Sequence, residues 1–141
     1  MANYVKFDQF VEDLAKKVHN LNSDTLKVML TNTAPSAANT VLANITEITP
    51  GNGYSAGGSA ATFVSGAQSS GTYKLVLNDV TFTASGGSIG PFRYAVLYND
   101  TPTSPADPLI AWWDYGTSLT LTNGNSFTVD LDQVGGVFTA Q

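Results

Sequence analysis

The sequence predicts a mainly β protein, an antiparallel β-sandwich or jelly-roll-like domain with one amphipathic α-helix at its N-terminal end. Seven short segments after residue 71 are rich in β-forming side chains, and glycine, asparagine and proline turns separate them. The first 22 residues instead repeat apolar side chains at helical spacing. With 141 residues, the chain is expected to form one domain around a single core.

The helix is expected within residues 1–22. Its apolar side chains recur at steps of three and four residues, and acidic and lysine side chains occupy the opposite side. The apolar positions are Phe7, Phe10, Val11, Leu14, Val18 and Leu21. Such a helix is stable when its apolar side lies on another element of the fold.

Residues 23–71 are expected to contain a first strand and then long loops. Leu26, Val28 and Leu30 alternate with more polar neighbours, which is typical of a strand with one buried face. From Thr33 to Gly71 the chain is rich in Ala, Ser, Gly and Asn, a composition that loses much backbone entropy on ordering. These loops either clasp another subunit or move freely at the surface, and the sequence leaves both interpretations open.

Residues 72–141 are expected to form seven antiparallel strands. The segments are TYKLVLN, DVTFTA, FRYAVLYN, LIAWWDYG, SLTLTN, SFTVDLD and VFTA. The clearest predicted hairpin joins residues 118–123 to residues 126–132 through the dipeptide GN.

The two tryptophans are adjacent, so an extended strand points them to opposite faces. Trp113 shares a face with Leu109, Ala111 and Tyr115 and is predicted to enter the core. Trp112 shares the other face with Ile110 and Asp114. Burying such a ring is worth about 4–6 kcal/mol before entropy costs, so either the chain's own helix covers Trp112 or a partner protein does.

A contact surface is predicted on this second face. The strand FRYAVLYN is also apolar on both sides, so the surplus apolar surface spans two strands. The predicted interface residues are Ile110, Trp112, Asp114, Arg93 and Tyr54, the last in a glycine-rich loop.

Charge and composition limit the partners. The net charge of −5 disfavours direct binding to nucleic-acid phosphates and suits a basic protein surface. The chain has no cysteine, and we expect neither a secretory signal nor a membrane span, hence a chain that is made and kept soluble and has no membrane partner.

No set of residues predicts catalysis, a cofactor or a metal site. His19 lacks an evident nucleophile and orienting acid, so a surface or interface role is expected. Asp130 and Asp132 share a strand face and are interpreted as a solvated pair that protects a sheet edge. Glu47 and Asp114 are the acids with apolar context, yet we expect the protein not to be an enzyme.

Four motifs resemble small structural proteins of tailed-bacteriophage virions. They are ITPGNGYSAGG, YAVLYNDTP followed by DPLIAWWDYG, SLTLTNGNSFTVDLD and a terminal GGVFT, together spanning roughly residues 45–140. The resembling family comprises proteins taken as capsid cement (decoration) proteins or as tail-fibre-like proteins.

The resemblance to a cement protein implies a β-sandwich or β-tulip-like subunit without enzymatic activity or cofactor. It implies a location on the capsid surface of the virion, with the major capsid protein as partner and a homo-oligomer, dimer or trimer, as the assembled form. A tail-fibre or receptor-binding adhesin module is the alternative, in which an exposed Trp112 beside Asp114 would stack on a sugar. A host-made bacterial surface module is disfavoured because no export signal is expected.

Overall fold

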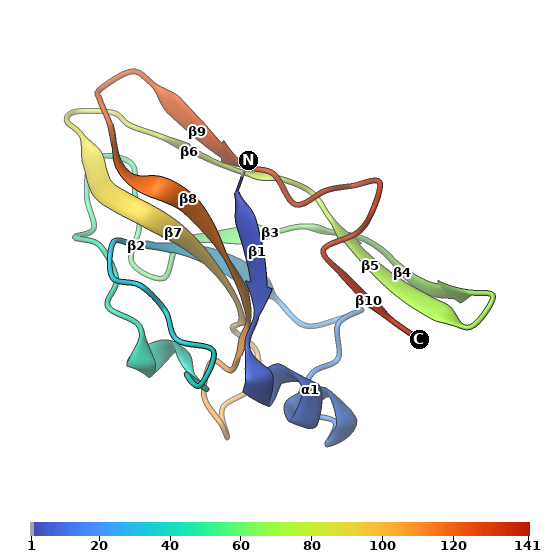
Figure 1. Ribbon diagram of the computed structural model, residues 1–141. Coiled ribbons are helices and arrows are strands. Elements are labelled where there is room, and N and C mark those ends of the chain that lie inside the picture. The colour runs from blue at the N-terminus through green and yellow to red at the C-terminus, as the bar shows by residue number, and fades with distance from the viewer. Residues whose placement is uncertain (1) are drawn as a thin grey trace.

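A five-stranded antiparallel sheet forms the larger layer of the molecule. The computed structural model describes residues 2–141, and its strands confirm the predicted mainly β, antiparallel sandwich class. The strand order is β1 (Asn3–Lys6), β8 (Leu109–Leu121), β7 (Ile89–Asn99), β2 (Leu26–Thr31) and β3 (Ser59–Ala61). Figure 1 shows β7 and β8 as the long curved strands at the centre of this layer.

Two smaller sheets form the other layer. One has the order β10 (Phe138–Ala140), β5 (Thr72–Leu77) and β4 (Phe63–Ser69), and the other pairs β6 (Val80–Thr83) with β9 (Ser126–Val129). The β4–β5 hairpin projects from the body of the molecule (Figure 1). The apolar side chains of both layers meet in one hydrophobic cluster that includes Val28, Leu75, Phe82 and Leu97.

The N-terminal helix is shorter than predicted. Residues 3–6 form β1, and α1 spans only Asp8–Ala15. Phe7 is extended and its backbone N–H donates to the carbonyl of Ile110, which continues the β1–β8 ladder to the helix start. Lys17 adopts a left-handed conformation with φ 66°, which stops the helix before the apolar positions Val18 and Leu21 are reached.

Two further strand predictions are wrong. Residues 59–61 and 63–69 are strands rather than loops, and the segments LIAWWDYG and SLTLTN form one continuous strand, β8. β9 therefore pairs with β6 and not with residues 118–123. The β6–β9 pairing matches apolar Val80 and Phe82 to Val129 and Phe127 across one face, with threonine and serine hydroxyls hydrogen-bonded across the other.

Residues 33–58 lie on the five-stranded sheet of the same chain. The hydroxyl of Thr31 in β2 donates to the carbonyl of Thr46, and the Tyr98 hydroxyl in β7 donates to the Gly57 carbonyl at 2.6 Å. Gly58 has φ +78° and passes so close to the Val28 carbonyl that no side chain fits there. The segment includes a short 3₁₀ helix, η1 (Leu42–Asn44), and these contacts hold it on its own sheet. Contact of its exposed side with another subunit stays a prediction.

Both tryptophans are buried, each with 7% of its surface exposed. The Trp112 ring packs against Phe7 at a centroid distance of 4.5 Å, so the segment that leads into α1 covers it. Trp113 contacts Tyr4 edge-to-face and lies near Leu131 and Val137, toward the second layer. Of the two explanations for Trp112, the structure therefore shows coverage by the N-terminal segment of the chain itself.

Replacing Trp112 with alanine is expected to lower the free energy of unfolding by about 3–5 kcal/mol, because it opens a cavity beneath Phe7. Trp113→Ala should cost a similar amount. Urea denaturation followed by circular dichroism measures both. The control is Val134→Ala, at a side chain that is 87% exposed, which should change stability by less than about 0.5 kcal/mol. A Trp112→Ala protein as stable as the parent would contradict the coverage by Phe7.

Candidate functional site

The predicted interface does not form an exposed surface. Ile110 is 0% exposed and Tyr54 is 2% exposed, and Trp112 lies under Phe7. The prediction that these three side chains contact a partner is wrong, because the N-terminal segment and residues 33–58 already cover this face of the sheet.

Tyr54 has a structural role within its own chain. Its hydroxyl accepts a hydrogen bond from the backbone N–H of Leu30 at 3.1 Å and donates to Glu47 Oε2 at 2.8 Å. The same carboxylate oxygen accepts the N–H of Gly57 at 2.6 Å. Burial, opposed in part by the hydrogen bond from Leu30, raises the pKa of Tyr54 well above its usual range. The contact fastens residues 47–57 to β2.

Arg93 and Asp114 form an ion pair on neighbouring strands. Arg93 Nε donates to Asp114 Oδ1 at 2.8 Å and Nη2 donates to Oδ2 at 3.1 Å, a bidentate geometry. The Arg93 hydrogen bonds and the Gly116 N–H lower the pKa of Asp114. Both side chains stay partly exposed, so a contact with a partner remains a prediction for these two residues.

One side of the sandwich is open. A groove of about 640 Å³ runs between β1 at the edge of the larger sheet and the segment from residue 130 to β10. We call it the open-side groove; its lining residues are Ala2, Tyr4, Lys6, Trp113, Asp130, Leu131, Asp132, Gly135, Gly136, Val137, Phe138 and Thr139. Figure 1 shows the two segments that line it, the blue β1 strand and the red C-terminal segment.

The outer edge of β1 is free in the described chain. β1 is the last strand of its sheet, and the Phe7 N–H bond to Ile110 places Phe7, Val5 and Asn3 in the register positions that hydrogen-bond β8. Tyr4 and Lys6, which alternate with them, therefore turn their backbone N–H and C=O groups outward toward the open side.

The groove has an apolar floor and a charged rim. Trp113, Leu131 and Val137 are buried in it, while the Tyr4 ring is 41% exposed. Partial burial raises the pKa of Tyr4 to about 12, so its hydroxyl is protonated at neutral pH. The rim carries one cation, Lys6, against the carboxylates of two aspartates.

Those two aspartates are Asp130 and Asp132. Asp130 Oδ1 accepts the Asp132 N–H at 2.9 Å, and Asp132 Oδ1 accepts the Gly135 N–H at 2.9 Å. Asp130 is exposed at the end of β9, and the bonds hold the turn that leads to β10. The prediction that the two aspartates share a strand face is wrong, because β9 ends at Val129 and Asp132 adopts a left-handed conformation with φ 49°.

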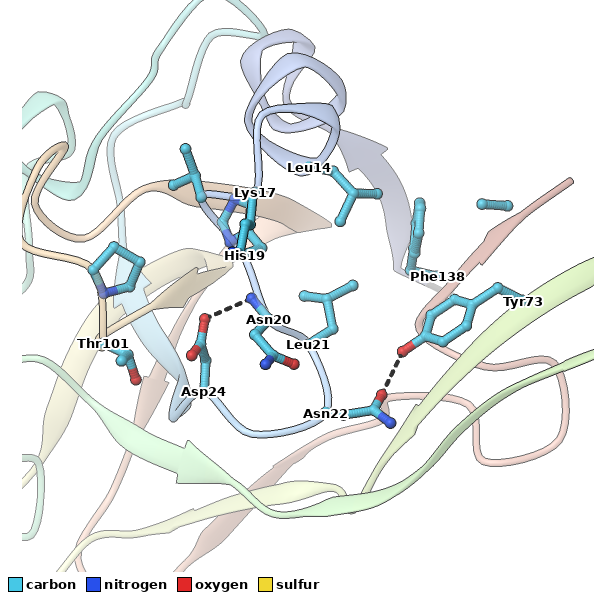
Figure 2. A pocket seen from close by; sticks show the side chains of 13 residues that line it. Leu14, Lys17, His19, Asn20, Leu21, Asn22, Asp24, Tyr73, Thr101 and Phe138 are labelled. Atoms are coloured by element: carbon cyan, nitrogen blue, oxygen red, sulfur yellow. Dashed lines mark hydrogen bonds between the residues drawn. The ribbon is translucent and has the colours of Figure 1, made fainter.

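A second pocket, of about 620 Å³, lies between the segment after α1 and the β5–β10 part of the smaller sheet. We call it the His19 pocket. Figure 2 shows Leu14, Leu21, Tyr73 and Phe138 around it, and the Tyr73 hydroxyl donates to Asn22 Oδ1 at 3.0 Å. A further bond, from the Asn20 N–H to Asp24 Oδ2 at 2.8 Å, orders the loop that forms one wall.

His19 is buried beside this pocket, with 6% of its surface exposed. The expected surface role of His19 is therefore wrong. Asn99 Oδ1 accepts the Thr101 N–H, which orients the amide so that Nδ2 donates to His19 Nδ1 at 3.0 Å and to Asp24 Oδ2 at 2.7 Å. Nδ1 is thus an acceptor, and the neutral ring carries its proton on Nε2. Nε2 is buried and has no hydrogen-bond partner among residues 2–141.

Burial lowers the pKa of His19 below its usual value, and the nearby carboxylates of Asp13 and Asp24 oppose this only in part. The imidazole is therefore neutral at pH 7. It joins the segment after α1 to the end of β7 through Asn99 and acts as a buried structural link.

Within residues 2–141, no group of three or more histidine, cysteine or acidic side chains is placed to hold a metal ion. In the same range, no helix is both long and apolar enough to cross a membrane.

The sequence pattern does not predict the open-side groove. The helix expected within residues 1–22 includes Tyr4 and Lys6, which are strand residues in the structure. The available signal was the alternation in NYVK, where Tyr4 and Lys6 fall on one side and Val5 on the other. The pairing of this short segment with β8 is a long-range contact that alternation alone does not reveal.

Comparison with known proteins gives no match. No protein-family model matches the chain, and no curated protein sequence or solved structure is significantly similar to it.

Replacing Tyr54 with phenylalanine should destabilise the protein by about 1–3 kcal/mol, because the buried Leu30 N–H loses its acceptor. Thermal and urea denaturation measure the change. Tyr115→Phe is the matched control, since no hydrogen bond of the Tyr115 hydroxyl occurs within the described residues. Equal stability of the two variants would show that the Tyr54 hydroxyl does not fasten the loop.

The single histidine permits a direct titration. By ¹H–¹⁵N NMR we expect the Nε2–H tautomer and a pKa below about 6.5. Because the folded pKa lies below the unfolded one, the stabilisation is complete above pH 6.5 and is lost as the pH falls toward the folded pKa. His19→Gln should not show this loss of stability as the pH falls. A folded-state pKa above 6.5, or the Nδ1–H tautomer, would contradict the arrangement.

Proposed function

We propose that this protein is a non-enzymatic structural protein of a tailed-bacteriophage virion that binds the outer surface of the major capsid lattice. In this role it bridges neighbouring capsomers and stabilises the head against the outward pressure of the packaged DNA. The protein is made in the host cytoplasm, binds no nucleic acid directly, and acts at the capsid surface as a homo-oligomer, a dimer or trimer.

The open-side groove is the observation that carries this proposal. It leaves the exposed Tyr4 ring and a free strand edge beside a buried apolar floor, a combination that suits attachment to another protein. The sandwich class agrees with the one implied by the motif resemblance to virion proteins. The net charge of −5 favours a basic surface on the capsid.

The attachment site differs from the one expected on the second face of β8. That face is covered by the chain itself, so the proposal now relies on the opposite side of the same strand, where Trp113 and Tyr4 meet. A stable contact there needs about 800 Å² on each partner, which the groove supplies only together with the surfaces around it.

A tail-fibre or receptor-binding module is the second candidate. The same groove brings the Tyr4 and Trp113 rings near the carboxylates of Asp130 and Asp132, and aromatic rings together with carboxylates can bind sugars. The version of this proposal that used an exposed Trp112 is not retained, because Trp112 is buried.

Copy number separates the two candidates. A capsid cement protein should be present in hundreds of copies per particle, whereas a tail adhesin should be present in a few tens at most. Quantitative mass spectrometry of purified virions, with the major capsid protein as internal standard, measures the copy number per particle.

Capsid shells lacking the protein should also rupture at a lower temperature and regain stability when the purified subunit is added.

A copy number of a few tens per particle, or unchanged shell stability on addition of the subunit, would contradict the capsid role. Recovery of the protein with tails after heads and tails are separated would favour the adhesin role. Absence from the particle would exclude both.

A further inference from the structure

We propose that the open-side groove takes an extended segment of the partner protein, which pairs with the free edge of β1 as a sixth strand of the larger sheet. The identity of the partner rests on the proposed function. The mode of binding rests on the geometry of the groove.

The first step is the backbone of β1. Tyr4 and Lys6 turn their N–H and C=O groups away from β8, and the described chain places no strand beside them. An extended peptide can satisfy these groups with a ladder of main-chain hydrogen bonds, whereas a globular surface or a small molecule satisfies them only in part.

The second step is the shape of the groove next to that edge. Side chains of a strand alternate, so every second side chain of the added segment would point into the groove. There it meets the buried surfaces of Trp113, Leu131 and Val137, and it covers the exposed ring of Tyr4. The inward positions of the segment should therefore be apolar apart from one at the charged rim, and the others face solvent.

The third step is charge. Lys6 on the β1 side faces Asp130 and Asp132 on the other, so the rim carries one positive and two negative side chains. Each aspartate uses only its Oδ1 atom in the turn bonds given above, which leaves its Oδ2 atom available to a cation. A segment with one basic side chain near these carboxylates matches the rim and the acidic character of the whole chain.

The free edge of β4 is less suitable. β4 is also the last strand of its sheet, but the Asn22 side chain donates to the Gly66 carbonyl at 3.2 Å in the middle of that strand. β1 has no proline, and Lys6 is its one charged side chain, so little prevents a further strand from pairing with it.

A peptide probe tests the mode of binding without the partner. The probe is acetyl-VTVTRTV-amide, in which the valines and the arginine share the inward positions, and the readout is ¹H–¹⁵N NMR of the full-length protein. Hydrogen exchange of the Tyr4 and Lys6 amides should slow at least tenfold in the complex, while that of Val5, already bonded to β8, should change little. Docking through side chains alone does not produce this alternation.

Two backbone-modified probes serve as controls. N-methylation of the valines and arginine, or of the threonines, blocks one or the other hydrogen-bonding edge of the peptide. At least one of the two should bind at least tenfold more weakly than the parent peptide. Equal binding of all three peptides would overturn strand addition, even if every protein variant failed to fold.

Lys6→Pro and Lys6→Ala form the matched pair of protein variants. Proline removes the outward N–H without removing a bond to β8, so the sheet should persist. Lys6→Pro should weaken peptide binding at least tenfold, and Lys6→Ala less than threefold. The same pair is then tested on capsid shells assembled from the major capsid protein alone.

The outcomes separate this proposal from the proposed function. Shell binding by the parent that Lys6→Pro leaves unchanged would overturn strand addition and leave the capsid role standing. Peptide pairing without shell binding would overturn the capsid role and leave strand addition standing. Maltohexaose that shifts the Trp113 indole signal, with no peptide binding, would overturn the proposal in favour of a sugar site. A concentration-dependent dimer that Lys6→Pro abolishes would identify a second copy as the occupant instead.

Discussion

The larger sheet is apolar on both faces, and the need to cover both organises the rest of the molecule. Strands β7 and β8 bury side chains on each side, as the two adjacent tryptophans show most directly. The smaller sheets cover one face, and Phe7 with residues 33–58 covers the other. Residues 33–58 supply few side chains of their own to the core, so their position depends on the sheet beneath them.

This constraint explains why polar contacts within the long connecting segments are so specific. Residues 33–58 contain little apolar surface, and they are fastened by the Tyr54 hydroxyl, the Glu47 carboxylate and the hydroxyls of Thr31 and Tyr98. Each bond satisfies a polar group that would otherwise be buried without a partner. The His19–Asn99–Asp24 contacts do the same for the segment after α1.

The same constraint locates the surface that remains for a partner. Coverage of both faces is complete except along one side, where β1 and the C-terminal segment do not meet and Tyr4 stays exposed. A protein that completes this side gains main-chain hydrogen bonds and apolar burial at one place. Such a compact attachment site suits a small subunit that attaches to a regular lattice, which is the role proposed for this protein.

The two-residue period of a strand is enough to predict the β class, the apolar faces of most strands and the opposite orientations of Trp112 and Trp113 from the sequence alone. What covers each face is visible only in the folded chain. The structure shows that residues 3–6 are a strand, that β9 pairs with β6, and that Ile110 and Tyr54 are internal. The physical reason is that local periodicity fixes the direction in which a side chain points, whereas its burial depends on segments distant in the chain, whose pairing depends on packing across the whole core.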